Sequence, residues 1–182
     1  MTKGTFAGAA FVESAIPEFF SCRANLPGMR MSMIFTTLAA LFCLLSTIAI
    51  HAEGLSVIRT EIGHRPVDER LRLIIVVSSA ILLHLTEIGF YAIAIWVLNV
   101  VVDVGDIVGA REFSGMDYFY YSAETFTALG SGDLSATGGL RLVASIEPLN
   151  GLVLIAWTGA FTYWVMEHYW SAKRGGAPEL RG

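Results

Sequence analysis

The sequence predicts an all-α membrane protein with three transmembrane helices and a short re-entrant helix followed by a loop. Hydrophobic residues make up 54% of the 182 positions, charged residues only 15%, and the mean hydropathy is +0.60, which lies outside the usual range of soluble proteins. Three apolar stretches are long enough to cross a bilayer. A fourth stretch, residues 120–133, is too polar to cross and too apolar for an exposed loop.

Composition also limits the partners. The net charge of −4 is small and dispersed, so we expect membrane lipids around the chain and no nucleic-acid partner. Cys22 and Cys43 indicate neither a disulfide nor a metal site, and no cofactor is expected. Residues 1–30 lack the continuous apolar region of a signal peptide and are predicted to form an N-terminal arm.

The first predicted transmembrane helix covers residues 31–52, of which the first twenty carry no charge. Residues 53–72 mix arginines with acidic residues and are expected to be a solvated, cytoplasmic connection. Residues 73–102 form the second apolar stretch, which is longer than a span needs and so predicts tilt or an extension beyond the bilayer. Residues 140–170 form the third, followed by a tail at 171–182.

Two ionisable residues lie inside the second span. His84 and Glu87 are three positions apart and therefore share one face of a helix. They are too few for a metal site, which needs three or four ligands. Two interpretations remain: a contact that holds this helix to the first helix or to the short one, or a proton sensor that responds between pH 5 and 8.

Ser114 and Asp117 are spaced as in a capping box, which predicts a helix over 115–127. Such a helix is about 20 Å long, too short to span. Backbone that is not helical survives at membrane depth only when protein buries it or when it lines water. One copy encloses no pore, so the pattern requires an oligomer.

The loop at 128–133 follows that helix and contains two glycines one residue apart, Gly130 and Gly132. Glycine lets alternate carbonyls turn toward one line, and a stack of carbonyls replaces the water shell of a permeating cation. The helix dipole would favour a cation at the same place, and Asp133 would lie at the outer mouth. The candidate carbonyls are those of Ala128, Leu129, Gly130, Ser131 and Gly132. A plain turn between two helices is the alternative.

The order of outer helix, short helix, glycine loop and inner helix resembles the pore module of potassium channels with two pore-forming helices per subunit. The residues at matching places are Ser122, Glu124, Thr125, Thr127, Gly130, Gly132 and Asp133. The resemblance covers about residues 73–170. The start of the last helix also resembles bacterial members of the ion channel group. It implies a selectivity filter at 128–133, a homotetramer around one pore and a place in the bacterial inner membrane. The helix at 31–52 is an addition to this module.

The filter departs from the family pattern Thr-Val-Gly-Tyr-Gly-Asp at two positions. Ala128 lacks the hydroxyl that would supply an inner coordinating oxygen, and Ser131 lacks the ring that would brace the loop. A less braced filter should discriminate less between potassium and sodium. The sequence therefore predicts a channel for monovalent cations, potassium and also sodium, with no metal site beyond these permeant ions.

Other residues gain roles from the same resemblance. It places Glu124 and Asp133 together behind the filter, where the two carboxyls should share one proton, and it counts Thr125 and Thr127 as filter support. In the last helix, Gly151 and Gly159 are expected to mark either bending points or close packing.

Lysine and arginine counts predict the orientation. With three spans, the side holding 53–72 and the tail carries seven basic residues against five on the other side, which puts the N-terminus outside and the C-terminus in the cytoplasm. Two alternatives remain for function. One is a non-conducting subunit or scaffold with the pore fold. The other is a Gly-x-Gly-Asp intramembrane aspartyl protease, but it needs a second aspartate within a span, which the sequence lacks, so no enzyme is expected.

Overall fold

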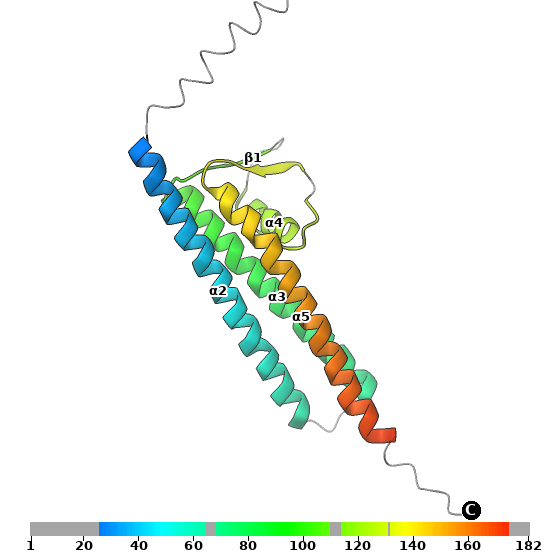
Figure 1. The fold of residues 1–182 in the computed structure, drawn as a ribbon. Helices are drawn as coiled ribbons and strands as arrows, with labels where there is room; N and C mark the ends of the chain where they lie inside the picture. Colours follow the sequence, from blue (N-terminus) through cyan, green and yellow to red (C-terminus); the bar gives the residue numbers. More distant parts are fainter. Residues whose placement is uncertain (1–25, 65–67, 110–113, 131, 175–182) are drawn as a thin grey trace, which may run out of the picture. The chain divides into compact units, whose positions relative to one another are not determined.

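The computed structural model describes residues 26–64, 68–109, 114–130 and 132–174. Residues 1–35 and 36–182 form two separate units, and the packing below concerns the second. Figure 1 shows the elements in chain order. These are helix α2 (Leu26–His64), helix α3 (Glu69–Trp96), the π-helical turn η2 (Val97–Val101), strand β1 (Ile107–Gly109), helix α4 (Gly115–Phe126), strand β2 (Leu134–Ala136) and helix α5 (Leu140–Arg174).

Three of the helices are long and apolar enough to cross a membrane, as the sequence predicts. The candidate spans are Met31–Gly63, Arg70–Val101 and Leu140–His168. Helices α3, α4 and α5 pack closely against one another, and α4 lies beside the half of α5 that contains its N-terminus (Figure 1).

Most of the predicted connection over 53–72 is helical, and its solvated, cytoplasmic character stays a prediction. Helix α2 continues to His64 and α3 begins at Glu69. Arginine and glutamate are good helix formers, and no proline occurs in this stretch before Pro66. Residues 65–67 lie outside the described residues. The same holds for the first 25 residues of the predicted arm and for residues 175–182 of the tail.

Helix α4 matches the predicted short helix, with Thr127 as its C-terminal cap. The Ser114 backbone N–H donates to Asp117 Oδ2 at 2.6 Å, which is half of the predicted capping box. The sequence did not predict strands β1 and β2, which pair antiparallel with Val108 opposite Ser135. Beside them Gly105 is needed because a Cβ there would lie 2.2 Å from the Thr137 carbonyl oxygen.

The core lies where α3, α4 and α5 meet. Tyr91, Phe126 and Leu154 are fully buried there. Gly151 on α5 lets the end of α4 approach closely, since a Cβ at this position would lie 2.1 Å from the Phe126 carbonyl oxygen. At 1.5 Å per residue, Gly151 lies about 16 Å along α5 from Leu140. The C-terminus of α4 is therefore fixed beside the middle of a candidate span.

Candidate functional site

The loop that follows α4 begins by closing the helix end. Leu129 N–H donates to the Glu124 carbonyl at 2.9 Å, and Ala128 N–H donates to the Thr125 carbonyl at 3.0 Å. The hydroxyls of Thr125 and Thr127 donate to carbonyls one turn back, those of Tyr121 and Ala123, at 2.8 and 2.7 Å. Both threonines thus hold the last turn of α4, directly before the predicted filter.

The backbone of this loop is left-handed at three of the four residues of 128–132 that the structure describes. The φ angles are +56° at Ala128, +57° at Gly130 and +80° at Gly132, while Leu129 keeps a negative φ. Left-handed residues of this kind allow neighbouring carbonyls to turn toward one line. Ala128 adopts this conformation as the residue after the cap Thr127, where the hydrogen bonds of Ala128 and Leu129 close the helix end, although its Cβ makes the conformation costly. Ser131 lies outside the described residues.

A cavity of about 380 Å³ lies between this loop, α4 and α5. Its lining consists of Tyr121, Glu124, Thr125, Ala128, Gly130, Gly132, Leu134, Ala144 and Pro148. Glu124 is buried at its wall, whereas Asp133 is exposed. The shared proton of Glu124 and Asp133 stays a prediction.

Glu147 is a buried carboxyl that sequence reasoning did not select. The Ser122 hydroxyl oxygen lies 2.9 Å from the Ile88 carbonyl and 2.5 Å from Glu147 Oε1. A hydroxyl has one hydrogen to donate, so both contacts are hydrogen bonds when Glu147 carries a proton and donates to Ser122. Within the described part of the chain, the other oxygen of Glu147 is buried without a hydrogen-bond partner, which also suits the neutral acid because an unpaired buried charge is costly.

A second polar contact joins three long helices. The Asn150 side-chain amide of α5 donates to the hydroxyl of Thr47 on α2 at 2.6 Å and to that of Tyr91 on α3 at 3.0 Å. All three side chains are buried. This contact joins α2 to α3 and α5, and so does the contact of His51 with Glu87 described next.

His84 and Glu87 meet a third group, His51 on α2. Glu87 Oε1 lies 2.8 Å from His51 Nδ1, and Glu87 Oε2 lies 2.9 Å from His84 Nδ1. His51 and Glu87 are fully buried. The Thr158 hydroxyl of α5 lies 3.0 Å from His84 Nε2 and 3.4 Å from His51 Nε2.

Among the residues that the structure describes, His51, His84 and Glu87 also come close enough for a metal ion, with ligand atoms within 4.8 Å of one another. Their direct contacts have hydrogen-bond lengths, so we interpret the group as hydrogen-bonded. His51 follows the uncharged stretch directly and lies within the predicted first helix, 31–52, so the rule for ionisable residues at membrane depth could have selected it.

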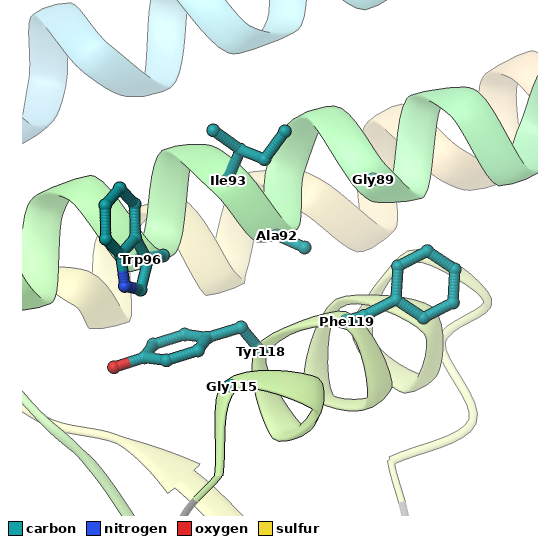
Figure 2. Close-up of a pocket in the computed structure, with 7 residues that line it drawn as sticks. All are labelled: Gly89, Ala92, Ile93, Trp96, Gly115, Tyr118 and Phe119. Atoms are coloured by element: carbon teal, nitrogen blue, oxygen red, sulfur yellow. The ribbon is translucent and has the colours of Figure 1, made fainter.

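A separate groove of about 390 Å³ lies between α3 and the start of α4. Figure 2 shows Trp96 and Tyr118 at one end and Phe119 near Gly89 at the other. Its lining residues carry no charge, so it is not suited to guide ions. The Tyr118 hydroxyl donates to Asn99, and burial, followed by the nearby Asp106 carboxylate, raises the pKa of Tyr118 above its ordinary value.

Comparison with known proteins gives one result that bears on this arrangement. A protein-family model described as "Ion channel" matches residues 73–167, which is 95 of the 182 residues. The matched segment contains most of α3, all of α4, the glycine loop and most of α5. Searches of curated proteins and of solved structures gave no match. With more than half of its length matched, the chain belongs to the ion channel family.

Proposed function

We propose that four copies of this chain surround one pore and conduct monovalent cations through the backbone carbonyls of residues 128–132. The observation that carries this proposal is the left-handed backbone at Ala128, Gly130 and Gly132. It supports carbonyls on one side of the loop, where they would replace the water around a cation.

The position of α4 supports the same proposal. Its C-terminus lies beside Gly151, in the middle of a candidate span, so its dipole would place negative potential inside the bilayer. Leu129 is exposed, and the space beside Gly130 and Gly132 is open in a single chain. Neighbouring copies would cover this face, because exposed loop backbone is not tolerated in lipid.

We further propose weak discrimination between potassium and sodium. Ala128 offers a methyl group where the family pattern has a hydroxyl, and the described lining of the cavity behind the loop has Tyr121 as its one aromatic side chain. Recordings from purified protein in a bilayer, with potassium and sodium on opposite sides, test this directly. We expect a reversal potential between the two equilibrium values. A reversal at the potassium value would contradict weak selectivity, and anion current would contradict the cation pore.

A glycine variant separates conduction from assembly. Gly130→Val places a β-branched residue at a φ of +57°, where such residues are genuine outliers, so we expect cation flux into liposomes to be lost while the oligomer persists. Gly115→Val is the matched control, because Gly115 has open space and no positive φ. A wild-type tetramer without flux would favour the non-conducting subunit instead.

Two charged residues refine the proposed pore. Neutralising Asp133 by Asp133→Asn should lower single-channel current most at low ionic strength, where screening is weakest.

Glu124→Ala should change how long the channel stays conductive if the buried Glu124 carboxyl supports the filter. Open times that are equal to those of the wild type at every pH would rule out that role.

The orientation remains part of the proposal, with the N-terminus outside and the C-terminus in the cytoplasm. A protease site added after Gly182 should be cut only when the enzyme has access to the cytoplasmic face.

A further inference from the structure

Four side chains from three helices form a closed ring of polar contacts. Glu87 is in contact with the Nδ1 atoms of His51 and His84, and the Thr158 hydroxyl lies near the Nε2 atoms of the same two rings. The ring joins α2, the helix outside the segment matched by the family model, to α3 and α5.

The number of hydrogens in this ring decides its charge. Four hydrogen bonds need four hydrogens, but an ionised Glu87 supplies none, the Thr158 hydroxyl supplies one, and each neutral imidazole supplies one. Three hydrogens leave one contact without a donor. With one more proton on an imidazole, every contact becomes a hydrogen bond: Thr158 accepts from one Nε2 and donates to the other.

Electrostatics favours the same count. Without the extra proton the ring holds a net charge of −1 beside the fully buried Glu87 and His51, and burying an unbalanced charge is costly. One proton makes the ring neutral. A second would place two positive imidazoles face to face, with ring centroids 5.4 Å apart, which like-charge repulsion opposes.

The surroundings supply no other charge among the groups that the structure places against these rings. Helix α5 presents the Thr158 hydroxyl and the Trp157 ring, which lies 5.2 Å from His51. Helix α4 presents Phe126, 6.0 Å from His84. Glu87 on α3 is the charged partner of both histidines.

We propose that His51, His84, Glu87 and Thr158 form a binding site for one excess proton, shared between the two imidazoles, and that this proton stabilises the attachment of α2 to α3 and α5. The site is independent of conduction and of the filter, so its test requires no channel current.

The sign of the pH effect follows from the proton count. Above the ordinary imidazole value of about pH 6.5, the unfolded chain has lost its histidine protons while the folded ring retains one. The free energy of unfolding should therefore fall as pH rises from 7 until the ring loses its proton. For a chain of this size, one proton corresponds to a fall in the unfolding midpoint of about 4 °C per pH unit.

The experiment uses the full chain, purified in detergent and treated with a chelator, with unfolding midpoints measured between pH 7 and 9. Thr158→Val removes the hydroxyl and should reduce the pH slope to less than half of that of the wild type. Thr158→Ser should restore the slope, and His168→Gln, which changes an exposed histidine on α5, should leave it unchanged.

Nitrogen-15 NMR of labelled histidines gives a second, direct readout. We expect one imidazolium equivalent at pH 7.5 to be distributed over His51 and His84. Two neutral rings at this pH, or a Thr158→Val slope equal to that of the wild type, would overturn the proposal. Stoichiometric zinc in the purified protein, with a pH slope that disappears after chelation, would also overturn it in favour of a metal.

Discussion

Helices α4 and α2 are held against the same two helices, α3 and α5, by different means. The end of α4 meets α5 backbone to backbone at Gly151, with Phe126 fully buried. Helix α2 makes buried polar side-chain contacts, Thr47 with Asn150 and His51 with Glu87. Close packing is rigid and depends on shape, whereas polar contacts depend on proton and hydrogen-bond balance. The comparison teaches that the end of α4, which leads into the proposed filter, is fixed by close backbone packing, whereas α2 is joined to its neighbours by polar contacts in addition to apolar side chains such as Ala40 and Cys43.

The largest effect is expected where backbone meets backbone. In Gly151→Ala the new methyl group would lie 2.1 Å from the Phe126 carbonyl oxygen, so α4 has to shift, and we expect a loss of about 3 kcal/mol in the free energy of unfolding. Gly159→Ala is the control, because nothing described lies within 4 Å of its Cβ. Equal unfolding midpoints for the two variants would show that α4 is not fixed by close packing.

Next in size is the polar contact of α4 with α5. Glu147→Ala removes one of the two hydrogen-bond partners of Ser122 and opens a cavity, which should cost about 2 kcal/mol. Glu147→Gln resembles the neutral acid in shape and donors and should cost less than about 1 kcal/mol. Denaturant titrations in detergent compare the two variants. If glutamine were as damaging as alanine, Glu147 would have to be ionised.

A smaller effect is expected for α2. Asn150→Leu removes two hydrogen bonds between helices, each worth about 0.6 kcal/mol in membranes, so about 1 kcal/mol should be lost. Thr47→Val removes one of them. A double-mutant cycle over the two positions measures their coupling, and additive costs would show that the contact does not hold α2.

The smallest effect concerns the loop between these regions. Ala128 has a φ of +56°, so Ala128→Gly should relieve strain and raise the free energy of unfolding by about 0.5 kcal/mol. Ala128→Thr restores the family hydroxyl but adds a β-branched side chain, and it should lower stability. A Gly variant that is no more stable than the wild type would indicate that the strain is relieved in the assembled protein.

The sequence predicts elements with local signals well. Ser114 and Asp117 identify α4 because a capping box depends on residues three apart, and the three apolar stretches identify the three helices. The left-handed turns at Gly130 and Gly132 are conformations that glycine permits.

The rest depends on contacts between residues that are distant in sequence. His51 and Glu87 are 36 positions apart in the sequence, and Thr47 and Asn150 are 103 positions apart. No local sequence pattern predicts contacts between residues so far apart. Gly151 and Gly159 look alike in sequence, yet Phe126 lies against only one of them within the part of the chain that is described. The pairing of β1 with β2 was missed because each strand has only three residues.

The loop from Thr127 to Asp133 is short, and both of its ends are anchored. Gly151 fixes the end of α4, while β2 is paired with β1 and leads into α5. Anchoring both ends of a short segment removes part of its conformational entropy when the chain folds. A cation entering the proposed filter would therefore spend less of its binding energy in ordering the loop than it would in a loop with free ends.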